Sequence, residues 1–310
     1  MFSYSTIIRK AYISSKNNPR LWLFGLFVVG GFNLNFLQFQ NIPLRRMVVE
    51  NQPAELFNYF QARPGVLAAI SAAILLFTVF GLVVTNWSRV MLILLGQQAL
   101  ENHPQDIKVS ARESKKSLMG VIKISLLTGA LMCVVAVVLI VPTLWLPMEN
   151  PLWILLLEAS VVVFLPLAFA ISCINIFTAF YLVLHKMPLN KALNCGIDFF
   201  VSVWPKILGL VAVLMVIYLG SFALGISVIF LAKEILRLLL LILVRFHILP
   251  LSAIILMLKT ISTVLFWFLL AGLSVFFNQS LLVLFLELSK PIENPEYKKE
   301  IEPVPAAVSV

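Results

Sequence analysis

Six long stretches of the chain consist almost entirely of apolar residues, and shorter polar stretches separate them. A helix needs about 20 apolar residues to cross the hydrocarbon core of a bilayer. The first stretch becomes polar beyond Asn33 and is marginal in length, whereas the other five are long enough. The pattern therefore predicts about six transmembrane helices, over 21–31, 66–95, 124–147, 152–184, 207–232 and 260–286.

Two of the polar stretches have apolar residues at helical spacing, which is typical of a helix that lies in the membrane interface. In the stretch 186–206 the apolar positions are 189, 192, 193, 197, 200, 203 and 204, and Lys206 marks the turn into the next span. In the stretch 3–18 one face is formed by Tyr4, Ile7, Ile8, Ala11 and Tyr12. We expect both to be interfacial amphipathic helices.

The segment 233–259 is the hardest to assign, because it mixes charges with many leucines. A seventh span through it would place Arg245 and His247 near its centre, and a charge at that depth costs a few kcal/mol. The sequence therefore favours an interfacial or re-entrant helical hairpin here, with an additional span as the alternative.

Internal spacing suggests three tandem repeats. A basic residue opens spans one, three and five, and an asparagine lies near the end of spans two, four and six. These residues are Arg20, Lys123 and Lys206, and Asn86, Asn175 and Asn278. Chance could produce such matches in any series of apolar hairpins, but the regular spacing favours parallel repeats over 1–100, 101–188 and 189–288 within one membrane domain, 1–288.

Composition agrees with a membrane protein. Hydrophobic residues make up 61%, charged residues 12%, and the mean hydropathy is +1.01, which excludes a water-soluble domain of this size. The net charge of +9 is interpreted as a signal for orientation rather than for nucleic acid, because Lys and Arg collect on the cytoplasmic side. Their distribution predicts that both termini are cytoplasmic. The tail 289–310, rich in Pro, Glu and Lys, is expected to be disordered.

Three blocks carry a resemblance to a known group of proteins. They are Leu-Trp-Leu-Phe-Gly-Leu-Phe at 21–27, the block 186–210 with Lys-Met-Pro-Leu-Asn-Lys-Ala-Leu and Trp-Pro-Lys-Ile-Leu-Gly-Leu, and Ala-Gly-Leu-Ser-Val-Phe-Phe-Asn-Gln-Ser-Leu-Leu-Val-Leu-Phe at 271–285. The chain resembles poorly characterised bacterial six-helix integral membrane proteins, which are similar to the membrane domain of some glycerophosphodiester phosphodiesterases. The resemblance implies a bacterial cytoplasmic (inner) membrane location. It transfers no catalytic residue, because the chain has no room for the phosphodiesterase barrel.

The sequence has no catalytic signature. It contains no phosphate loop of the G-x-x-x-x-G-K type, no H-E-x-x-H and no C-x-x-C, and His103, His185 and His247 lie on separate segments. We therefore expect no enzyme activity, no metal and no cofactor. The remaining candidates are polar residues within the spans, for which a structural role is the favoured interpretation. They are Asn86, Arg89, Glu158, Asn175, Asn278 and Glu287.

Two classes of function fit these features. In the first, basic residues beside the spans bind membrane lipids through anionic headgroups, or bind an unknown protein partner. The candidates for headgroup contact are Arg9, Lys10, Lys16, Lys115, Lys116, Lys186, Lys191 and Lys206. The alternative is a transporter or permease for a small solute, which would require charge in mid-span or paired broken helices. The amphipathic basic stretches favour lipid binding.

Overall fold

The computed structural model describes residues 3–28, 64–101, 103, 106–144, 151–245 and 251–289. All secondary structure in this part of the chain is helical, as predicted. The helices are α1 (Tyr4–Asn17), α2 (Arg20–Val28), α5 (Pro64–Leu100), α6 (Ile107–Leu144), α7 (Pro151–Leu184), α8 (Leu189–Arg245) and α9 (Leu251–Leu288).

Five helices of the described part, α5 to α9, are long and apolar enough to cross a membrane, and they coincide with the last five predicted spans. The chain is therefore a multi-pass membrane protein. The first predicted span is represented by α2, which has 9 residues. The remainder of that span, the polar stretch that follows it and the predicted disordered tail from residue 290 lie outside the described residues.

The predicted boundaries within residues 189–259 are wrong. The stretch 189–204, span five and the first part of the difficult segment form one continuous helix, α8, of 57 residues. Charged residues limit the part of a helix that can face lipid, but they do not end the helix. In α8 the side chains of Glu234 and Arg237, one turn apart, form an ion pair at 3.5 Å, which is compatible with a continuous helix. Residues 233–245 and 251–259 are thus extensions of α8 and α9 rather than a separate hairpin.

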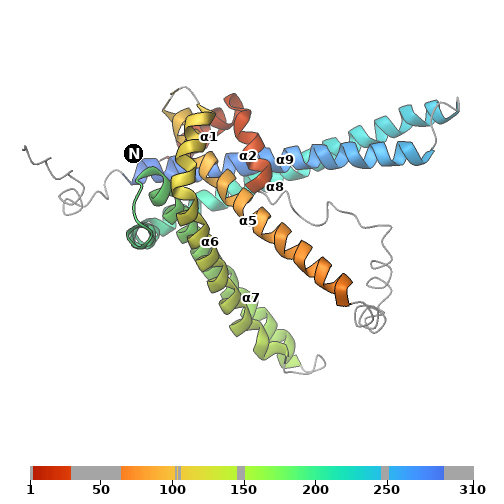
Figure 1. The fold of residues 1–310 in the computed structure, drawn as a ribbon. Coiled ribbons are helices and arrows are strands. Elements are labelled where there is room, and N and C mark those ends of the chain that lie inside the picture. Colours follow the sequence, from red (N-terminus) through yellow and green to blue (C-terminus); the bar gives the residue numbers. More distant parts are fainter. Residues whose placement is uncertain are drawn as a thin grey trace, which may run out of the picture.

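Pro205 lies inside α8 and accounts for a change of direction in its first part. Figure 1 views the start of α8 almost along its axis, whereas the rest of the helix runs across the picture. A proline inside a helix lacks the N–H that would bond the preceding turn, and its ring displaces the carbonyl four residues earlier. The residues before Pro205 therefore point away from the span, although no break separates them from it.

The helices meet in a packed hub, from which three apolar legs diverge (Figure 1). We define the hub as α1, α2 and residues 85–100, 107–125, 171–214 and 271–288. The legs are residues 64–84 of α5, the α6–α7 hairpin over 126–144 and 151–170, and the α8–α9 hairpin over 215–245 and 251–270. The described core residues cluster in the hub, whereas the side chains described on the legs are exposed or half-exposed apart from Thr128. Lipid contact therefore falls on the legs.

Phe285 of α9 lies at the centre of the hub core, where its ring joins α7 and α8 to α9. Its ring centroid lies 4.9 Å from that of Tyr181, 5.2 Å from Phe180 and 5.3 Å from Phe199. The tilted and edge-on geometries are those that aromatic rings prefer, each contributing about 0.5–1.5 kcal/mol beyond the area that it buries. Three helices are held together through this one side chain.

The two predicted amphipathic faces are turned only partly toward protein. In α1 the buried positions are Ile7, Ala11, Ser14 and Ser15, and this face packs against α9. At the start of α8 the buried positions include Ala192, Phe199 and Val203, whereas two members of the predicted face, Ile197 and Trp204, are 37% and 51% exposed. The periodicity identified helices correctly, but the apolar face of each is divided between the hub core and the surroundings.

Close contact between α7 and α8 depends on Gly196. A Cβ there would overlap the hydroxyl of Thr178 and lie 3.0 Å from its backbone nitrogen and 3.2 Å from its Cα. A side-chain contact can rotate away, but a backbone contact requires the helices to separate.

We predict that Gly196→Ala lowers the stability of the purified protein by about 1–3 kcal/mol, the usual cost of overpacking. The matched control is Gly129→Ala, because Gly129 of α6 has no neighbouring atom within 4 Å of the added Cβ. In an exposed helix that substitution is neutral or stabilising. The thermal midpoint in detergent micelles measures both, and equal midpoints for the two variants would contradict the close packing of α7 on α8.

Candidate functional site

A single polar turn of α5 contacts three other helices. Thr85 donates its hydroxyl to the Phe27 carbonyl of α2 at 3.2 Å, and the Trp87 indole N–H donates to Ser114 Oγ of α6 at 3.0 Å. Asn86 Oδ1 accepts from Ser125 Oγ of α6 at 2.6 Å. Arg89 Nη1 donates to Asn175 Oδ1 of α7 at 3.2 Å. We call Thr85, Asn86, Trp87 and Arg89 the polar turn.

Three of the sequence candidates are thus brought together, namely Asn86, Arg89 and Asn175. Asn86 is 6% exposed, and Arg89 is half-buried with an amide oxygen as its partner. Among the described residues no carboxylate pairs with Arg89. An amide can accept from a guanidinium without neutralising it, so the arrangement retains a positive charge between α5 and α7.

Gln279 of α9 completes the junction and was not among the sequence candidates. It is 1% exposed, its Nε2 donates to the Leu92 carbonyl of α5 at 3.4 Å, and its Oε1 accepts from Ser14 Oγ of α1 at 3.5 Å. Gly96 leaves the space that the Gln279 amide occupies, because a Cβ there would overlap it. The sequence signal was present, as a second amide beside Asn278 in an apolar span, but the two positions face different directions on the helix.

The other three candidates lie apart from the polar turn. The Asn278 amide donates to the Ser274 carbonyl of its own helix at 2.9 Å. Glu287 pairs with Lys10 of α1 at 2.8 Å at the end of α9. Glu158 is exposed on the α6–α7 leg. None of these three joins a cluster that resembles a reaction centre.

We predict that Asn175→Leu destabilises the protein more than Asn278→Leu does. The first substitution leaves a half-buried guanidinium without its acceptor, and hydrogen bonds to charged groups contribute about 1.5–3 kcal/mol. The second removes an amide that bonds to a carbonyl of its own helix, so no other helix loses a partner. Unfolding midpoints in detergent would compare the pair, and a larger loss for Asn278→Leu would show that Arg89 does not depend on Asn175.

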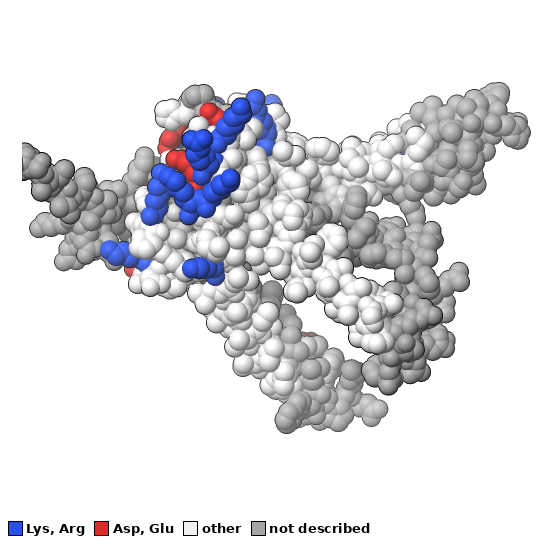
Figure 2. Space-filling model, in the orientation of Figure 1, with Lys and Arg blue, Asp and Glu red and all other residues white. Residues whose placement is uncertain are grey.

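Lysines and arginines gather over the hub in Figure 2, whereas the legs present almost entirely uncharged atoms on the same face. All eight candidates for headgroup contact belong to hub elements, α1, α6, the turn after α7 and the first part of α8. We call these eight residues the basic belt. Its members come from stretches far apart in the sequence, and each lies on an element of the hub.

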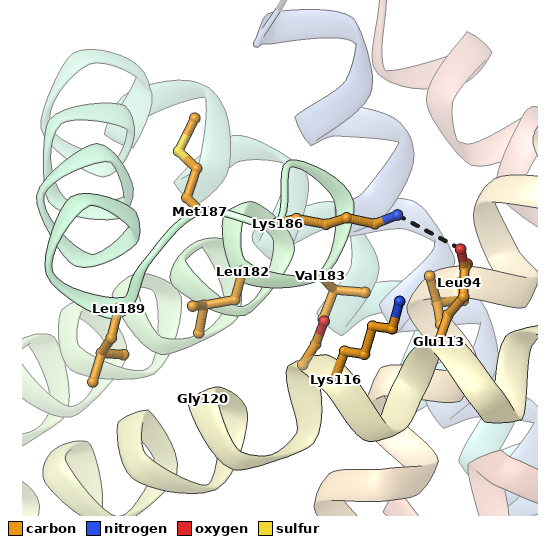
Figure 3. A pocket seen from close by; sticks show the side chains of 10 residues that line it. Leu94, Glu113, Lys116, Gly120, Leu182, Val183, Lys186, Met187 and Leu189 are labelled. Carbon is orange, nitrogen blue, oxygen red and sulfur yellow. Dashed lines mark ion pairs between the residues drawn. The ribbon is translucent and has the colours of Figure 1, made fainter. Parts of the chain in front are cut away.

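One cavity of about 290 Å³ opens among these charges, between α5, α6, α7 and the start of α8 (Figure 3). Its polar lining consists of Glu113, Lys116, Ser117 and Lys186. Its apolar lining consists of Leu94, Gly120, Leu182, Val183, Met187 and Leu189. The Lys186 ammonium lies 3.6 Å from a Glu113 carboxylate oxygen. The cavity thus combines two cations and one anion with an aliphatic wall.

A second cavity, of about 600 Å³, lies between α1, the end of α5 and α9. Its lining includes Lys10, Glu101 and Glu287, and Lys10 is already paired with Glu287. The two carboxylates balance or exceed the positive charge there, so this cavity is less suited to an anion than the first.

Within the described residues, no group of three His, Cys, Asp or Glu side chains is placed to hold a metal ion. No family model matches the chain, and no curated protein or solved structure matches it either.

Proposed function

We propose that this protein binds membrane phospholipids through the anionic headgroups that face its basic belt, and that it acts without catalysis. The separation of charge between hub and legs carries this proposal. Within the described helices the charged residues of the legs are Glu158, Lys233, Glu234, Arg237, Arg245 and Lys259, whereas the hub holds the whole belt. A molecule with apolar legs and one basic end fits a bilayer with the belt at the headgroups of one leaflet.

The spacing of charges along the long helices supports this placement. Lys206 and Lys233 in α8 are 27 residues apart, and Lys259 and Glu287 in α9 are 28 apart, with no charged residue between the members of either pair. At about 1.5 Å per residue each interval spans roughly 40 Å. That length matches the about 40–45 Å of a bilayer including its headgroups.

We further propose that the chain has six spans in three tandem units, with the hub and both termini on the cytoplasmic side. The α6–α7 and α8–α9 hairpins would be the second and third units, and α2 with α5 would belong to the first. Asn86 and Asn278 support the repeat, because each amide donates to the carbonyl four residues earlier in its own helix, at 2.8 and 2.9 Å. The resemblance to bacterial six-helix membrane proteins agrees with this arrangement and with a cytoplasmic membrane location.

The topology predicts that position 150 lies on the outer side and position 300 on the cytoplasmic side. Single cysteines at these positions, in a chain lacking Cys133, Cys173 and Cys195, would be labelled in intact cells with an impermeant thiol reagent. We expect labelling at 150 and protection at 300. The same result at both positions would overturn six spans with cytoplasmic termini.

Lipid binding predicts that phosphatidylglycerol is enriched over phosphatidylethanolamine in protein purified in mild detergent. Each lysine near an anionic surface contributes about 1 kcal/mol, falling off within a Debye length of about 8–10 Å. Replacing Lys115, Lys116, Lys186 and Lys191 together by neutral residues should abolish the enrichment without changing the cysteine labelling. If native mass spectrometry finds bulk lipid ratios in the unmodified protein, the belt serves only to orient the chain during insertion.

A further inference from the structure

The cavity between α5, α6, α7 and α8 differs from the rest of the belt because two lysines from different elements line the same hollow. Lys116 comes from α6 and Lys186 from the turn between α7 and α8, and in Figure 3 both side chains extend toward Glu113. One carboxylate cannot neutralise two ammonium groups, so the cavity keeps an excess positive charge.

The ion pair within the cavity is loose. The distance of 3.6 Å between Lys186 Nζ and Glu113 Oε1 exceeds the about 2.7–2.9 Å of a charge-assisted hydrogen bond. The side chains of Lys186 and Glu113 are 69% and 41% exposed, and pairs of this kind contribute little to stability. Lys186 is therefore free to turn toward a stronger anion without a large loss.

The backbone holds Lys186 in an unusual conformation. Its φ is +53°, in the left-handed region that residues with a Cβ rarely adopt. A left-handed residue just past the last helical residue is a common way for a helix to end, and α7 ends at Leu184. Here this conformation directs a lysine over the cavity at the turn His185 to Pro188, where a glycine or asparagine would fit the backbone better.

The lower part of the cavity is aliphatic and has room for more than a free ion. Gly120 contributes no side chain, and a Cβ on it would meet Leu182 only at 3.4 Å, an ordinary contact. The glycine is therefore not required for helix packing, and its effect is to leave the cavity open. An apolar wall beneath a pair of ammonium groups matches the change from phosphate to hydrocarbon within a phospholipid.

We propose that this cavity is a specific site for the phosphate of an anionic phospholipid, with its oxygens between Lys116 and Lys186 and its glycerol and upper acyl carbons against Leu182, Val183 and Leu189. Ser117, which also lines the cavity, has a hydroxyl that supplies a further donor. This inference rests on the proposed function and deepens it, by assigning one site within the belt where lipid is held rather than loosely attracted.

The test uses the full-length protein in mild detergent, titrated with phosphatidylglycerol and followed by native mass spectrometry. Lys116→Gln and Lys186→Asn should each weaken phosphatidylglycerol binding about fivefold, the weight of one lysine at a headgroup. Asparagine suits the left-handed backbone at 186, so a loss there reports on charge rather than strain. Lys115→Gln, in the belt but outside the cavity, should lose less, and Lys108→Gln, outside both, should bind as the unmodified protein does.

A second pair of variants tests the space rather than the charge. Gly120→Leu should fill the cavity and reduce binding at least as much as Lys116→Gln does. Gly129→Leu places the same side chain on the same helix, where an added Cβ meets no atom within 4 Å, and should bind normally. Because leucine favours helix more than glycine does, neither change should prevent folding.

The outcomes separate the two levels of the proposal. Suppose that the unmodified protein shows the enrichment. Equal losses for Lys115→Gln and Lys116→Gln, or no effect of Gly120→Leu, would then overturn the cavity site but leave lipid binding by the belt intact. Displacement of phosphatidylglycerol by millimolar inorganic phosphate would also overturn it, because the cavity would then take a free anion. No enrichment in the unmodified protein would overturn the proposed function itself.

Discussion

The arrangement of the hub depends on the need to satisfy polar groups in apolar surroundings. A buried donor or acceptor without a partner costs about 1–3 kcal/mol. The side chains of the polar turn of α5 form hydrogen bonds with α2, α6 and α7. Gln279 of α9 forms a hydrogen bond with the backbone of α5. Each partner helix is thereby fixed in rotation and depth relative to α5.

Apolar packing then adds strength to an arrangement that polar contacts specify. Between helices in lipid, burial of apolar area gives little advantage, since acyl chains are as apolar as leucine. The remaining stabilisation comes from close packing of the helices, as at Gly196 against Thr178 and in the ring contacts of Phe285.

Much of the fold could be predicted from sequence, because a membrane-spanning helix can be identified by its length and composition alone. The five long helices coincide with predicted spans, and Asn86, Arg89 and Asn175 were identified as polar positions of interest. Three things could not be predicted. Helix continuity through Pro205 and Lys233 depends on local bonding rather than hydropathy. The role of Gln279 depends on which face of α9 meets α5. The cavity between Lys116 and Lys186 arises only when four elements are assembled.

The first and last described helices of the chain are partners. α1 packs against α9, with Lys10 paired to Glu287 and Ser14 bonded to Gln279. Synthesis proceeds from the N-terminus, so α1 is made first and acquires this neighbour only after every other described helix has left the ribosome. Until then Ile7 and Ala11, which are fully buried in the finished hub, have no α9 to cover them. The contacts between α1 and α9 can therefore form only after α9 has been synthesised, so the hub core around α1 is completed late.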